Sequence, residues 1–152
     1  MGYGARTPPR DVDPTTARPM IALDTTVLVR YLAQDDPVQS PIATALIEQQ
    51  LTPQNPGHVS SVVLAQLHGV LTRLYGVPRE RFADIARGLL SAQALHFDHL
   101  AAAWNALQAF EDGAEFVDAL QAELAGGAGC DATVTFDPRL ARHPKARLLV
   151  AA

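Results

Sequence analysis

The sequence predicts an α/β fold in which helices flank a small, mainly parallel sheet in three layers. Short apolar segments of strand length alternate along the chain with longer segments whose apolar residues recur at helical spacing. Several of the short segments end at an acidic or hydroxyl-bearing residue, as strands do when they lead into a capped helix. The length of 152 residues suits one domain with a single sizeable core.

Composition narrows the class of protein. Hydrophobic residues make up 48% of the chain, which favours a globular domain over a disordered one. The lone Cys130 excludes an internal disulfide framework, and no Cys/His spacing suggests zinc. The net charge of −4 argues against a surface built entirely for nucleic acid, although a local basic patch can bind phosphate. Without a long apolar stretch or a signal-peptide core, the chain is expected to be cytoplasmic, with no membrane span.

The first structured segment carries the first candidate site residue. Residues 1–19 hold turn-forming glycines and prolines, so we expect a flexible tail before a domain over 20–152. An apolar run from Met20 to Leu23 predicts a strand, and Asp24 stands where this strand leads into a helix. A carboxylate at the carboxyl end of such a strand lies in the crevice where open α/β sheets hold ligands. Asp24 can equally be the N-cap of the helix.

The rest of the chain continues the alternation. In order, the pattern predicts a helix through Ile42 after Asp35-Asp36-Pro37, a strand at 58–60, a helix over 62–75, a helix after Pro78, a strand at 94–97, a helix over 100–110 capped by Asp98, a helix opening at 114–122, and strands at 132–136 and 146–150. The helix over 62–75 is the most clearly periodic. Its expected inward stripe is Val63, Leu67, Val70, Leu71 and Leu74, with Ser60 or Ser61 as the cap.

Further polar residues fall at positions that suit a site. Gln66 lies beside the apolar stripe near a helix start and can point into the crevice of Asp24, or be a surface glutamine. Glu115 and Asp118 share one face in the first turns of a helix, where the dipole favours carboxylates whether or not they are functional. Asp137 follows a strand, so a second carboxylate stands at a strand's carboxyl end. We therefore expect several acids to converge at one sheet edge.

Four segments together resemble a known family. They are Ile-Ala-Leu-Asp24-Thr-Thr-Val-Leu-Val-Arg-Tyr-Leu, Ser-Ser-Val-Val-Leu-Ala-Gln66-Leu, Glu115-Phe-Val-Asp118-Ala-Leu and Thr-Val-Thr-Phe-Asp137. In this order they are similar to PIN-domain proteins, above all to the VapC-type ribonuclease toxins of bacterial type II toxin–antitoxin modules. The resemblance covers Met20 to about Leu149, and each motif on its own is weak.

The resemblance implies a PIN-like fold with a carboxylate pocket that binds Mg²⁺ or Mn²⁺ and cleaves RNA. By motif, Asp24, Asp118 and Asp137 are the metal-site acids and Glu115 is an additional acid. Gln66 stands where the family has a glutamate, and Thr26 where it usually has Asn or Ser. The family also implies a cognate VapB-like antitoxin and a homodimer.

The chemistry explains why such acids are grouped. Neighbouring carboxylates repel one another and partly protonate unless a hard divalent cation neutralises them. Such a cation can activate water for attack on a phosphodiester. Gln66 removes one negative charge from the cluster. At an effective dielectric of 20, a charge about 4 Å away is worth about 4 kcal/mol before desolvation, so metal binding and activity should be weak.

Other interpretations stay open. Arg139, Arg142, Lys145 and Arg147 follow Asp137 and either hold RNA phosphates or form an ordinary solvated surface. Because of Gln66, the domain can also be a catalytically inactive scaffold that binds RNA or an antitoxin. A phosphatase with Asp24 as nucleophile is disfavoured, because Thr26 stands where such enzymes usually carry a second Asp.

Overall fold

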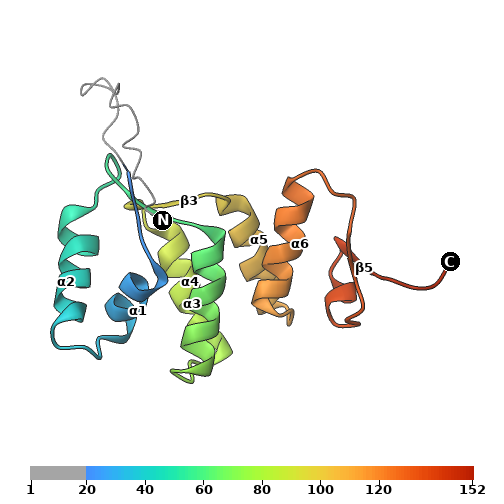
Figure 1. Cartoon of the computed structure of the whole chain (residues 1–152), viewed down its shortest axis with the longest axis horizontal. Helices are drawn as coiled ribbons and strands as arrows, with labels where there is room; N and C mark the ends of the chain where they lie inside the picture. Colours follow the sequence, from blue (N-terminus) through green and yellow to red (C-terminus); the bar gives the residue numbers. More distant parts are fainter. Residues whose placement is uncertain (1–19) are drawn as a thin grey trace, which may run out of the picture.

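The structure is a computed structural model that describes residues 20–152, so the tail expected over 1–19 lies outside the described residues. Strands alternate with helical segments along the chain, and each of the first three strands is followed by at least two helices (Figure 1). The strands are β1 (Ile21–Ala22), β2 (Gly57–Val59), β3 (Leu95–Phe97), β4 (Thr133–Thr135) and β5 (Ala146–Leu148). The helices are α1 (Thr25–Ala33), α2 (Gln39–Ala45), the π-helical turn η1 (Leu46–Gln50), α3 (Ser61–Arg73), α4 (Arg79–Ser91), α5 (Leu100–Glu111), α6 (Phe116–Gly127) and the 3₁₀ turn η2 (Leu140–Arg142).

The strands are parallel, as predicted, but they form two sheets. In the first sheet β2 lies between β1 and β3, with Ile21 opposite Gly57 and Gly57 opposite Leu95. The second sheet contains β4 and β5, with Val134 opposite Arg147. In Figure 1 the helices α3 to α6 stand between the start of the domain and β5. The α/β class is confirmed, whereas the expected single sheet edge is divided between two sheets because α6 delivers the chain to the far side of the helices.

Two of the predicted helix caps are present and one is used differently. Asp24 caps α1 and Ser60 caps α3, where the Ser60 hydroxyl accepts a hydrogen bond from the backbone N–H of Val63 at 3.2 Å. Asp98 was expected to cap α5, but its carboxylate accepts from the backbone N–H and the hydroxyl of Ser61 at 3.1 and 2.7 Å. Asp98 therefore ties the end of β3 to the start of α3, because parallel strands bring these two segments together.

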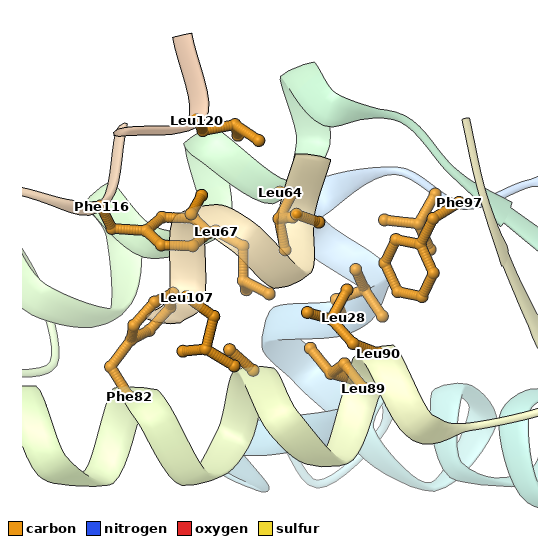
Figure 2. Packing of buried hydrophobic residues seen from close by; sticks show 14 of the residues in the cluster. Leu28, Leu64, Leu67, Phe82, Leu89, Leu90, Phe97, Leu107, Phe116 and Leu120 are labelled. Atoms are coloured by element: carbon orange, nitrogen blue, oxygen red, sulfur yellow. The ribbon is translucent and has the colours of Figure 1, made fainter. Parts of the chain in front are cut away.

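The core lies between the first sheet and helices α1, α3, α4, α5 and α6. Leu64, Leu67 and Leu71 are its buried residues on α3. At one end Phe82 of α4 and Phe116 of α6 pack edge to face with ring centroids 5.1 Å apart, beside Leu67 (Figure 2). Burial of these large side chains supplies the main stabilisation of the domain.

One residue of the predicted stripe faces solvent. The side chain of Leu74 is 78% exposed, because α3 ends at Arg73 and Leu74 occupies the C-cap, beyond the last turn that packs on the core. Periodicity alone does not mark where the helix stops, so the prediction for Leu74 was wrong.

Leu67 and Leu74 provide a matched pair of substitutions in α3. Leu67 is fully buried, so Leu67→Ala should lower the free energy of unfolding by about 2–5 kcal/mol through lost burial and a cavity. Leu74→Ala should change it by no more than about 0.5 kcal/mol. Urea unfolding followed by circular dichroism measures both values, and similar losses for the two variants would contradict this account of the core.

Candidate functional site

The first group of candidate residues lies where β1 and β2 lead into their helices; we call Asp24, Thr25, Thr26 and Gln66 the Asp24 half. The carboxylate of Asp24 accepts from the Thr26 hydroxyl at 2.6 Å and from the Thr26 backbone N–H at 3.4 Å. These bonds hold the pKa of Asp24 below its ordinary value, and the bond from the Thr26 hydroxyl has the largest effect. The buried Thr25 donates its hydroxyl to Gln66 Oε1 at 2.7 Å. Gln66 therefore contacts the residue that follows Asp24, and its place in a site with Asp24 stays a prediction.

The second group lies around the start of α6; we call Glu115, Asp118, Asp137 and Arg139 the Asp118 half. Glu115 is the N-cap of α6 and Asp118 lies in its first turn. Partial burial raises the pKa of Asp118, the charges of Asp137 and Glu115 raise it further, and Arg139 opposes them. Asp137 accepts from the backbone N–H of Arg139 at 2.9 Å, with the Arg139 Nε 3.6 Å from the carboxylate. The fold therefore gathers three of the predicted acids within electrostatic range.

A cavity of about 630 Å³ opens beside this second group, between α5, α6 and the segment through η2. Its lining includes Glu115, Asp118, Glu123, Arg139, Arg142 and Lys145. Three of the four basic residues singled out in the sequence therefore line the cavity of Asp118, while Arg147 is exposed on β5. The guanidinium groups in this lining can pair with a phosphate.

Comparison with known proteins decides the family. The model of the PIN domain family matches residues 21–146, which is most of the chain. This protein belongs to the PIN-domain family. PIN domains are generally nucleases and typically depend on a divalent metal ion, so a nuclease-type function is indicated. No curated protein and no solved structure matches the chain.

In this PIN domain, the Asp24 half and the Asp118 half are separate within one chain. The acids that raise the pKa of Asp118 are Asp137 and Glu115, and Asp24 is not among them. Over residues 20–152, no group of three or more His, Cys, Asp or Glu side chains is close enough to hold a metal ion. The donor types suit a hard cation, but their arrangement within one chain does not fit one. Among the described helices, none has both the length and the apolarity needed to cross a membrane.

A cluster around Glu123 fixes the second half in place, and sequence reasoning missed it. Glu123 is 8% exposed, accepts from Lys145 Nζ at 2.6 Å and from Asn105 Nδ2 at 3.3 Å, and has His143 Nε2 at 3.4 Å. Burial alone would raise the pKa of Glu123, but the hydrogen bonds from Lys145 and Asn105 and the charge of Lys145 lower it overall. The sequence did contain a signal: Glu123 is an acid among the apolar and small residues of α6, and Lys145 is the single lysine of the chain.

The same cluster revises the interpretation of Lys145 and His143. Lys145 was expected to hold RNA phosphate or to be solvated, but its ammonium group is paired with a buried carboxylate. His143 is buried, and its Nδ1 accepts from the backbone N–H of Lys145 at 3.0 Å, which leaves the proton of the neutral ring on Nε2, facing Glu123. A Cβ on Gly126 would lie 3.1 Å from Lys145 Cδ, so the glycine gives the lysine chain room over α6.

Glu123→Gln should destabilise the protein in a pH-dependent way. At pH 7 the loss should be about 1–3 kcal/mol, because a buried charge-assisted hydrogen bond is removed. The folded pKa of Glu123 is lowered, so its stabilisation is complete above the ordinary value of 4.5 and disappears as the pH falls through the lowered folded value. Urea unfolding from pH 3 to pH 8 measures this.

The exposed Glu80 on α4 provides the control for this measurement. Glu80→Gln should change the free energy of unfolding by no more than about 0.5 kcal/mol at any of these pH values. A Glu123→Gln variant with the same deficit at pH 3 and pH 7 would show that the ionised carboxylate is not the source of the stability.

Proposed function

We propose that this PIN-domain protein is a Mg²⁺- or Mn²⁺-dependent endoribonuclease of the VapC type, the toxin of a toxin–antitoxin pair, active in the cytoplasm. The observation that carries the proposal is the electrostatic grouping of Asp118 with Glu115 and Asp137, in a chain that belongs to a nuclease family. Of these residues and their neighbour Arg139, Glu115, Asp118 and Arg139 line one cavity. The order of the four motifs along the chain, three of which carry an acid, supports the VapC type.

The electrostatics of the Asp118 half support a role in charge-driven chemistry. The raised pKa of Asp118 shows that its ionised form is disfavoured by burial and by neighbouring carboxylates, a condition that an incoming positive charge relieves. We assign Asp24, Asp118 and Asp137 as the acids of the active site, with Glu115 as an additional acid and Gln66 at the glutamate position of the family.

The substrate side of the proposal rests on the basic residues. Arg139 and Arg142 line the cavity of Asp118 and are exposed, so they can contact phosphates of a single RNA strand. Arg147 is a further exposed cation, on β5, whereas Lys145 contributes mainly to the Glu123 cluster. A VapB-like antitoxin would block cleavage by covering this cavity.

A second candidate function follows from Gln66. Its amide oxygen is engaged with the Thr25 hydroxyl, and the neutral side chain lowers the negative charge of the Asp24 half by one. In this alternative the domain binds RNA or an antitoxin without cleaving, which needs the basic surface but not a complete set of acids.

Substitution of the acids tests the nuclease. Asp24→Asn and Asp118→Asn should each lower RNA cleavage by about 100-fold or more, because each removes charge from the reacting centre. Chelation by EDTA should abolish cleavage, and Mn²⁺ or Mg²⁺ should restore it. Asp84→Asn on α4, where Asp84 pairs with Arg87, is the control and should retain full activity. Cleavage of a structured RNA that survives Asp118→Asn would refute the assignment.

Gln66→Glu separates the two candidate functions. If the protein is a nuclease weakened at this position, restoring the carboxylate should raise cleavage at low Mg²⁺ by about tenfold or more, since a charge at about 4 Å has a large effect even after screening. If the domain only binds, neither form cleaves, and both retain RNA binding in a filter or anisotropy assay. Equal cleavage by both forms at low Mg²⁺ would exclude an impairment caused by Gln66.

A further inference from the structure

Each of the two sheets ends in a strand that lacks a neighbour on one side. Over residues 20–152, β1 pairs with β2 alone and β4 pairs with β5 alone. Large apolar side chains are exposed on both strands and just after β4: Ile21 is 46% exposed, Val134 49% and Phe136, the residue after β4, 78%. An exposed strand edge flanked by apolar side chains is a surface that readily accepts another strand.

Along a strand, the backbone N–H and C=O groups of successive residues point to opposite sides, and this alternation defines how the free edges can pair. The N–H of Leu23 donates to His58, so Ala22, one residue before, directs its backbone groups to the outer edge of β1. Thr133 and Thr135 bond to the β5 side, so Val134 and Phe136 direct theirs to the outer edge of β4.

The outward-facing backbone groups allow these two edges to pair in parallel, and one register also brings exposed apolar side chains together. Ala22 lies opposite Thr135, its N–H donates to the carbonyl of Val134, and the N–H of Phe136 donates to the carbonyl of Ala22. Ile21 then lies opposite Val134, so two exposed apolar side chains meet on one face of the sheet.

This register brings the separated acids together. Asp24 is three residues after Ile21, and Asp137 is three residues after Val134. The two carboxylates would therefore stand side by side at the carboxyl ends of neighbouring strands, which lie about 4.8 Å apart. Asp118 accompanies Asp137, because the two already interact within one chain.

The position of β4 within the chain favours a different molecule as the source of a strand for the edge of β1. Within one chain, the Glu123 cluster and the buried Leu140 hold the segment of β4, η2 and β5 against α6. In Figure 1 the blue start of the domain and β5 lie on opposite sides of α5 and α6. Pairing within the chain would require breaking the Glu123 cluster, whereas a second copy can present its β4 with that cluster intact.

We propose that two copies of this chain exchange strand contacts in a two-fold dimer, in which β4 of each copy pairs in parallel with β1 of the other. Each active site then takes Asp24 and Gln66 from one copy and Asp118 and Asp137 from the other. The roles of these acids rest on the proposed function, while the pairing of the strands does not. Reciprocal exchange is the arrangement that satisfies both free edges at once.

Cross-linking between two singly substituted chains tests the pairing. In a Cys130→Ser background, one preparation of the full chain carries Ile21→Cys and a differently tagged one carries Val134→Cys, and the two are co-expressed. Paired strands place these Cα atoms within the roughly 7 Å that a disulfide requires. Oxidation should therefore give a mixed disulfide dimer at about tenfold the yield of a control pair in which Leu74→Cys replaces Val134→Cys.

Two results of this experiment overturn the proposal. One is a yield of mixed dimer no greater than that of the control pair, from variants whose circular dichroism matches the parent. The other is a double variant, Ile21→Cys with Val134→Cys, that forms its disulfide only within single chains. The pair Ala22→Cys and Thr135→Cys, which also lies in register, replaces the first pair if either variant fails to fold.

Mixing two inactive proteins provides the second readout. Co-expressed Asp24→Asn and Asp118→Asn chains should recover up to about a quarter of the wild-type cleavage, because half of the dimers are mixed and each mixed dimer has one site with both native acids. If each site is instead built within a single chain, every site in this mixture lacks one of the two acids, and the mixture stays inactive. An inactive mixture therefore contradicts the proposal. If the wild-type protein does not cleave RNA, the proposed function fails, while the disulfide yield still decides the strand pairing.

Discussion

The buried carboxylate of Glu123 is the interaction on which the arrangement of this domain depends. It joins α6 to Lys145 and His143, and through them holds β4, η2 and β5 against the helices. Among residues 20–152, the hydrophobic core draws its buried members from positions 23–120, so the C-terminal segment contributes little to it. A buried charge without its partners is strongly unfavourable. The cluster therefore holds the C-terminal segment in one specific position, which non-directional apolar packing would not do.

That attachment explains why the acids form two groups. Asp24 and Gln66 lie where the first sheet leads into α1 and α3, while Asp118 and Asp137 lie where α6 and β4 meet. Asp24 is stabilised in its ionised form by Thr26, whereas the ionised form of Asp118 is disfavoured by its acidic neighbours. The two groups thus differ in electrostatic character, and the Asp118 group is the one that gains most from a positive charge.

Membership of the PIN-domain family and the geometry of the single chain can be combined. The family indicates a nuclease, and the cavity beside Asp118 combines acids with arginines that can face a phosphate backbone. The free edges of β1 and β4 have complementary hydrogen-bonding positions, and the pairing that we propose would align Asp24 with Asp137. An active site shared between two copies would make assembly a condition of catalysis, so that cleavage would depend on protein concentration.

The sequence by itself determined the local features: the alternation of helices and strands, the caps at Asp24 and Ser60, the acids at strand and helix ends, and the family. These depend on residues close together in the chain, where periodicity and capping chemistry act. Only the tertiary structure decided that Asp98 serves α3 rather than α5, that Lys145 pairs with Glu123, that Leu74 faces solvent, and that the strands divide into two sheets. Such outcomes follow from contacts between segments far apart in sequence, whose partners local patterns do not specify.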